Sequence, residues 1–106
     1  MSELFRIQEL LAQINDSHRY HEFLRVPEMS AGVYVLPAGA IDRQSPHNED
    51  EIYYVIRGQA KMKLGAEERA VEPGDVIFVE RNLGHRFFEI AKELVLLVVF
   101  APAESA

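Results

Sequence analysis

Residues 45–58 read SPHNEDEIYYVIRG, and this stretch decides the fold that we predict for the chain. A histidine and a cluster of acidic residues come first, a run of strand-forming residues follows, and a glycine closes the stretch. Alternate residues of a strand share one face, so Tyr53 and Val55 lie on one side and Ile52 and Ile56 on the other. Because both sides carry apolar residues, we expect a strand that is covered on both faces.

His47 and Glu51 lie four residues apart at the start of this stretch. A helix would place both on one face, but Pro46 before them and the β-branched and aromatic run after them disfavour a helix. On a fully extended strand their side chains lie about 13 Å apart, too far for one ion with ligands at about 2.1 Å. If both bind one metal, residues 48–50 must therefore form a turn or bulge that brings His47 back over Glu51.

Outward from this stretch, the chain alternates between short apolar strands and turns rich in glycine and proline. We expect strands at residues 23–26, 29–37, 51–57, 60–64, 69–71, 76–79, 85–90 and 93–100. Gly58-Gln59 is interpreted as a type II′ hairpin turn and Ala91-Lys92 as a further turn. The pattern predicts an all-β sandwich or barrel over about residues 20–101. Residues from Pro102 onward are expected to fray.

One amphipathic helix is predicted before the strands, over about residues 3–14. Apolar residues recur at helical spacing between positions 4 and 14, and Ser2 is a suitable N-cap. We expect this helix to cap one end of the sheet or barrel. His18 and His21 follow in a polar stretch, and we interpret them as surface residues rather than as a site.

Length and composition set the class of protein. A chain of 106 residues fits one domain, and a hydrophobic fraction of 48% argues against disorder. The net charge of −6 opposes binding to a nucleic-acid backbone, which relies on cationic patches. Charged residues interrupt the first ten positions, so we expect no signal peptide. The apolar run 94–100 is far shorter than the roughly 20 residues of a membrane span. We expect a cytoplasmic protein without a membrane partner.

The later part of the chain supplies one more histidine, His85, at the start of a predicted strand. The chain has no cysteine, so any metal must be held by nitrogen and oxygen ligands. Strand alternation places Phe87 and Glu89 on the face of His85, and Tyr53 on the face of Glu51. We therefore expect these side chains to point toward one interior.

The spacing of these residues resembles that of the cupins, small β-barrels with two metal-binding motifs. The first motif is Gly, five residues, His, one residue, His, three or four residues, Glu, six residues and Gly. Five residues stand at its positions: Gly39, Ser45, His47, Glu51 and Gly58. The second motif is Gly, five residues, Pro, one residue, Gly, two residues, His, three residues and Asn. This chain matches it at Gly74 and His85. Three positions depart from it: Glu80, Asn82 and Glu89 stand where Pro, Gly and Asn are usual.

The resemblance, which covers about residues 33–100, implies a cupin-type double-stranded β-barrel (jelly roll) with a short N-terminal helix, as one domain over residues 1–106. Ser45 stands where the family has its first metal histidine, so the resemblance supplies three ligands: His47, Glu51 and His85. Two histidines and a carboxylate form a facial triad, which suits Fe(II) with open positions for substrate and oxygen. Zn, Mn, Ni or Cu can also occupy such a set, and the ligands do not distinguish among them.

Further roles follow for the neighbouring residues. Ser45, Tyr53 and Phe87 are expected to line the substrate pocket, and Glu89 is the candidate general base. Core packing is the alternative for Tyr53 and Phe87. A barrel without metal is the alternative for the whole site, and Glu51 would then need another partner, such as a nearby arginine.

The function that we predict from this pattern is that of a metal-dependent enzyme, a dioxygenase or an isomerase, acting on a small oxygen-bearing molecule. The alternative is a non-catalytic module that binds or senses a small, sugar-like molecule, and a storage role is a third interpretation. We also predict a homodimer, because the runs 76–79 and 94–100 are apolar on both faces and an open edge strand invites pairing.

Overall fold

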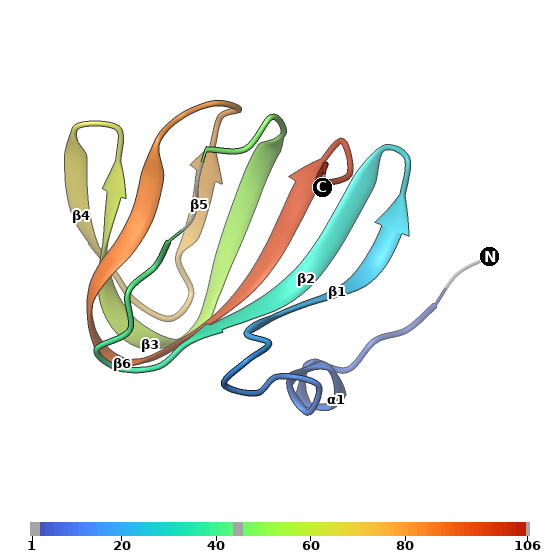
Figure 1. Ribbon diagram of the computed structural model, residues 1–106, viewed down its shortest axis with the longest axis horizontal. Helices are drawn as coiled ribbons and strands as arrows, with labels where there is room; N and C mark the ends of the chain where they lie inside the picture. Colours follow the sequence, from blue (N-terminus) through green and yellow to red (C-terminus); the bar gives the residue numbers. More distant parts are fainter. Residues whose placement is uncertain (1–2, 44–45, 106) are drawn as a thin grey trace.

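The computed structural model describes residues 3–43 and 46–105. The elements, in chain order, are α1 (Ile7–Leu11), β1 (Tyr20–Val26), β2 (Met29–Leu36), β3 (Asp50–Leu64), β4 (Glu67–Val71), β5 (Val76–Val79) and β6 (His85–Ala101). These strands form one antiparallel sheet in the order β1-β2-β6-β3-β4, and β5 pairs with β3 (Figure 1). The predicted all-β class is confirmed.

Two long strands make the sheet curl on itself. β3 has 15 residues and β6 has 17, and the two pair along nearly their whole length. The first part of β3 also pairs with β5, and its last part pairs with β4. β3 has different neighbours along its length, and the sheet is curled (Figure 1). The buried side chains of the core lie on its inner face.

The predicted hairpin at Gly58-Gln59 is wrong, because β3 continues through both residues. Gly58 has a positive φ of 112°, and the pairing of β3 with β6 shifts register on either side of it. A Cβ atom at Gly58 would collide with the carbonyl oxygen of Glu93 and lie 2.6 Å from the Cα atom of Leu94. The glycine is therefore needed where the two backbones cross at close range, and it marks a bulge instead of a turn.

The predicted turn at Ala91-Lys92 is wrong for the same reason, since β6 runs without a break from His85 to Ala101. Glu89 has a φ of 47°, which is unusual for a residue with a side chain. This irregularity lies opposite the shifts in β3, where Gln59 faces Lys92 and Lys61 faces Phe88. The two strands thus bend together at one place.

The helix is shorter than predicted and begins at Ile7 instead of Glu3. Arg6 is its N-cap residue, has extended backbone angles and makes no side-chain cap hydrogen bond. Phe5 packs on Phe23 of β1 with ring centroids 4.8 Å apart, and residues 3–6 form no helical turn. The predicted N-cap Ser2 lies outside the described residues. No helix in the described ranges is both long and apolar enough to cross a membrane.

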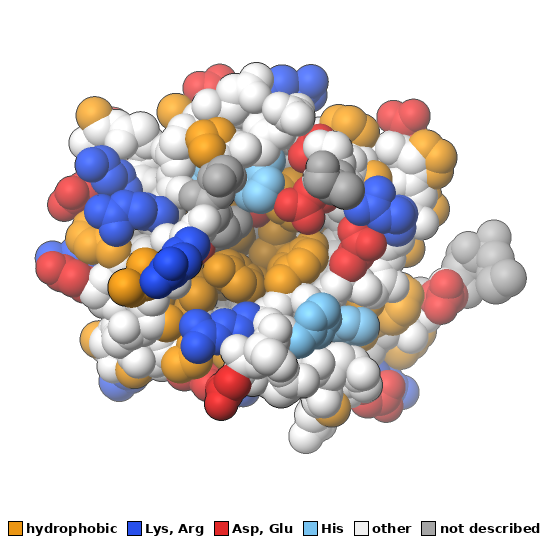
Figure 2. Space-filling view, viewed as in Figure 1, with side chains coloured by type: hydrophobic (Ala, Val, Ile, Leu, Met, Phe, Trp, Pro, Cys, Tyr) orange, Lys and Arg blue, Asp and Glu red, His pale blue; other side chains and the backbone are white. Residues whose placement is uncertain are grey.

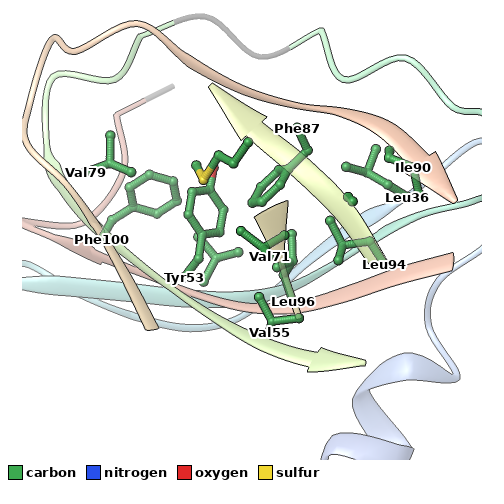
Figure 3. Close-up of a cluster of buried hydrophobic side chains, with 13 residues drawn as sticks. Leu36, Tyr53, Val55, Val71, Val79, Phe87, Ile90, Leu94, Leu96 and Phe100 are labelled. Atoms are coloured by element: carbon green, nitrogen blue, oxygen red, sulfur yellow. The ribbon is translucent and has the colours of Figure 1, made fainter. Parts of the chain in front are cut away.

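The core fills the space inside the curled sheet. Tyr53 of β3 and Phe87 of β6 are fully buried and meet edge to face, with ring centroids 5.0 Å apart. Aliphatic side chains from β2 to β6 surround this pair (Figure 3). The candidate site borders this core, because His47 packs on Phe100 and His85 contacts Tyr53.

Candidate metal centre

Three predicted ligands converge at one end of the curled sheet. His47 precedes β3, Glu51 is the second residue of β3, and His85 is the first residue of β6. Each offers one ligand atom, and these atoms all lie within 4.8 Å of one another. The chain bends at Asn48 and Glu49, as the spacing of His47 and Glu51 required. This group can hold a metal ion.

The Glu51 carboxylate lies between the two imidazoles. Its Oε1 atom is 3.2 Å from Nε2 of His85 and 3.8 Å from Nε2 of His47. The side chain is 1% exposed, yet neither carboxylate oxygen has a hydrogen-bond partner among the described residues, because the imidazole contact at 3.2 Å lacks hydrogen-bond geometry. A buried carboxylate without such a partner is costly. A cation between these three side chains would satisfy it.

Among the described residues, no arginine forms a hydrogen bond with the Glu51 carboxylate. Arg57, a candidate partner for Glu51 on the basis of strand alternation, is exposed, and its guanidinium lies 3.6 Å from Glu93. Arg86 lies over the ring of Phe88, with its Cζ atom 5.3 Å from the ring centroid. The donor set and the orphaned carboxylate therefore fit a metal ion better than a structural ion pair.

The His85 ring is held in one orientation. Its Nδ1 atom lies 3.0 Å from the carbonyl oxygen of Leu83, which can only accept, so the neutral ring carries its proton on Nδ1. The Nε2 atom then faces Glu51 and the Tyr53 hydroxyl, which is 3.2 Å away. Burial lowers the pKa of His85, but the contacts with Glu51 and Leu83 together raise it above the usual value.

The His47 ring has a carboxylate on its outer side. Nδ1 of His47 lies 3.2 Å from Oε2 of Glu104, and this hydrogen bond is the main reason that the pKa of His47 is raised. The ring also packs edge to face on Phe100, with centroids 4.9 Å apart. The backbone N–H of Asn82 donates to the carbonyl oxygen of His47 at 2.7 Å. The backbone is therefore held at the candidate ligand His47 itself.

Glu104 is a site residue that the sequence reasoning missed. The expected fraying is wrong for residues 103–105, because hydrogen bonds hold this part of the chain. The backbone N–H of Glu104 donates to Ser30 Oγ at 2.9 Å, and the Ser105 hydroxyl donates to the buried Glu49 carboxylate at 2.9 Å. No motif spacing indicates an acid at position 104, so only the folded chain shows it.

A cavity of about 240 Å³ opens beside the ligands. Its lining residues come from β1, β2 and β6 as well as from the site: Tyr20, Tyr34, His47, Glu51, Val98, Phe100 and Glu104. In Figure 2, hydrophobic side chains form the floor of a hollow that histidine and acidic side chains border. Burial raises the pKa of both tyrosines, so both hydroxyls are neutral donors at ordinary pH.

Other predicted site residues lie elsewhere. Glu89 does not face the interior: its side chain is 64% exposed and pairs with Lys61 at 2.8 Å, because the irregular backbone at Glu89 breaks the strand alternation. Tyr53 and Phe87 belong to the buried core, where Tyr53 contacts His85. Ser45 lies outside the described residues.

The two remaining histidines do not join the ligand group. His18 forms an isolated bridge with Asn15, and His21 lies in β1 opposite Val33. Within the described parts of the chain, the group of residues that can share an ion consists of His47, Glu51 and His85.

Comparisons with known proteins agree with this fold. The uncharacterized protein SCO3923 of Streptomyces coelicolor is 44% identical over 103 residues, covering 95% of this chain and 97% of that protein. The structure of TT1209 from Thermus thermophilus has a TM-score of 0.78 at 25% identity, covering 96% of this chain and 99% of that chain. A conserved protein with a double-stranded beta-helix domain from Klebsiella pneumoniae has a TM-score of 0.80 at 18% identity, over 96% and 91% of the two chains.

The family comparison covers the strands and loops that build the site. The model of the cupin domain matches residues 32–100, which include all three ligands and both long strands almost entirely. With this match and the close relative from Streptomyces, the chain belongs to the cupin superfamily.

Proposed function

We propose that this cupin binds one divalent metal ion through His47, Glu51 and His85 and acts as a metal-dependent enzyme on a small oxygen-bearing molecule. One observation carries the proposal: a buried carboxylate without a hydrogen-bond partner among the described residues lies between two imidazole Nε2 atoms. Iron, zinc, manganese, nickel and copper all accept this ligand set.

His47, Glu51 and His85 would hold the ion beside the cavity, and the ion would supply Lewis acidity or, as iron, activation of oxygen. The cavity of about 240 Å³ is smaller than the roughly 300–1,000 Å³ of pockets for drug-sized ligands. Val98 and Phe100 offer an apolar wall, while His47 and Glu51 form the polar end. A substrate that fits carries an oxygen donor at one end and a small apolar body. Dioxygenase and isomerase reactions are both compatible with such a substrate.

The test is metal binding by the purified chain and matched variants. We expect wild-type protein stripped of metal to bind one equivalent of Fe(II) or Zn(II) by titration calorimetry. His47→Ala and His85→Ala should weaken this binding by at least about 100-fold, because each removes a ligand. His21→Ala removes a histidine that lies outside the group and should bind like wild type. Equal affinity of wild type and His47→Ala would overturn the proposal.

A second function, a non-catalytic binding or sensing module, is favoured by the state of the carboxylates at the cavity. Those that line it within the described ranges are Glu51, a ligand, and Glu104, which pairs with His47, so neither is free to act as a general base. Two results together would support this function. Metal-loaded protein would retain a small molecule in native mass spectra, and it would show no oxygen consumption or isomerisation. Turnover would exclude it. A cytoplasmic location remains part of the proposal.

A further inference from the structure

We infer that Glu104 is a positioning residue for the metal ligand His47: its carboxylate accepts the Nδ1 proton and so turns Nε2 toward Glu51. The inference rests on the proposed metal function, because it assigns Glu104 a role toward that same site. The contact joins Oε2 of Glu104 to Nδ1 of His47 at 3.2 Å, with the side chains 26% and 17% exposed. The contact is therefore partly shielded from water.

The two imidazoles of the site are held in the same way. His85 has Nδ1 on the Leu83 carbonyl oxygen and Nε2 facing Glu51. His47 has Nδ1 on the Glu104 carboxylate and Nε2 facing Glu51. A carbonyl oxygen and an ionised carboxylate can only accept, so both neutral rings carry the proton on Nδ1. Both Nε2 lone pairs then point to the place between the three ligands.

The orientation of the His47 ring depends more on a hydrogen-bond partner at Nδ1 than the orientation of the His85 ring does. His85 begins β6, where backbone pairing with Leu64 sets its position. His47 precedes β3 and lies outside the sheet. The backbone of His47 is held by Asn82, but that bond does not decide which ring nitrogen faces Glu51. The carboxylate of Glu104 makes this choice, since it pairs with a protonated nitrogen and repels a lone pair.

The backbone of Glu104 is itself held by hydrogen bonds, and this fixes the position from which its carboxylate reaches His47. Its backbone N–H donates to the hydroxyl of Ser30, a fully buried side chain, and its carbonyl oxygen accepts from Arg25 at 2.7 Å. The next residue, Ser105, donates to Glu49. Glu104 is not part of the group whose ligand atoms lie within 4.8 Å of one another. Its carboxylate contacts Nδ1 of His47, whereas Nε2 of the same ring faces Glu51, so Glu104 orients the ring.

The first measurement needs no metal. In the full chain, at a pH where the imidazoles are neutral, long-range ¹⁵N–¹H correlation spectra distinguish the two ring tautomers. We expect the Nδ1–H tautomer for both His47 and His85 in wild type. Glu104→Ala should shift His47 toward the Nε2–H form and leave His85 unchanged, whereas Glu104→Gln, whose amide oxygen still accepts, should keep more of the Nδ1–H form.

The second measurement is Zn(II) affinity in the same variants. Glu104→Ala should raise the dissociation constant about 10- to 100-fold, the usual effect of losing a carboxylate behind a ligating histidine. Glu104→Gln should have a smaller effect. Glu67→Gln changes the charge equally on an exposed residue of β4 and should match wild type.

The two measurements separate this inference from the proposed function. A wild-type chain that binds no metal overturns the metal function, and the tautomer comparison still decides whether Glu104 orients the ring. If His47 keeps the Nδ1–H form in Glu104→Ala, the positioning role is wrong. An unchanged Zn(II) affinity in that variant would likewise overturn it.

Discussion

Gly32 lies beneath the ring of Tyr20, and this contact shapes the wall of the cavity. A Cβ atom at Gly32 would overlap the outer atoms of the Tyr20 ring, which itself lines the cavity beside His47. A side chain at position 32 must therefore displace the ring. The glycine thus lets an aromatic side chain from the neighbouring strand lie flat on the sheet.

We expect Gly32→Ala to lower the free energy of unfolding by about 1–3 kcal/mol, the usual cost of overpacking. The same change should cost clearly less in a Tyr20→Ala background, because the colliding ring is absent. Urea unfolding of the four proteins gives the coupling between the two positions. Additive effects would show that Tyr20 does not press on Gly32.

The three candidate ligands were predictable because they are few, polar and set at motif spacing. His47 and Glu51 follow from one stretch of sequence, and His85 follows from its place after the Pro-Gly turn. Glu104 was not predictable, because it reaches His47 only through the curl of the sheet. The predicted inward orientation of Glu89 was wrong because strand alternation assumes a regular backbone, which Glu89 does not have.

The bend shared by β3 and β6 decides how the strands enclose the core. Gly-Gln and Ala-Lys look like turns locally, so sequence reasoning divided each long strand in two. The folded chain keeps each strand whole and absorbs the irregularity as bulges. Local residue preferences cannot distinguish a turn from a bulge, because both use glycine and break the alternation.

Gly58→Ala tests this bend, with Gly74→Ala as its matched control. Both glycines have positive φ, of 112° and 95°, but Gly58 meets the neighbouring backbone, whereas a Cβ atom at Gly74 has nothing within 4 Å among the described residues. Gly58→Ala should cost about 2–4 kcal/mol of unfolding free energy, from backbone strain and collision together. Gly74→Ala should cost about 1–2 kcal/mol from strain alone. Equal losses in thermal or urea unfolding would contradict the close crossing.

An apolar face on the outside of the sheet bears on how the whole molecule assembles. Ile52 pairs with Phe78 and Tyr54 pairs with Val76 across β3 and β5, and all four side chains are 41–65% exposed. The apolar run Leu94–Phe100 does not require an interface between subunits, because β6 is an inner strand that lies between β2 and β3. The homodimer prediction therefore now depends on the outer face of β3 and β5.

We predict that a second copy of the chain covers this face, because a contiguous exposed apolar patch usually marks an interaction site. Phe78→Glu places a charge at the centre of the patch and should convert a dimer to a monomer in sedimentation at micromolar concentration. Ile41→Glu alters an exposed isoleucine in the loop between β2 and β3 and should leave the dimer intact. A wild-type chain that sediments as a monomer would contradict the prediction.

Segment 102–105 crosses near the loop that joins β1 and β2, where the N–H of Ala103 donates to the carbonyl oxygen of Pro27 (Figure 1). Hydrogen bonds and an exposed arginine tie it down, so its detachment is a local opening that requires less free energy than global unfolding. Each opening takes the Glu104 carboxylate away from His47. If the site binds metal as proposed, the ion and an attached segment stabilise each other, and the lifetime of the ion is coupled to the opening rate of a short segment that lies outside the candidate ligand group.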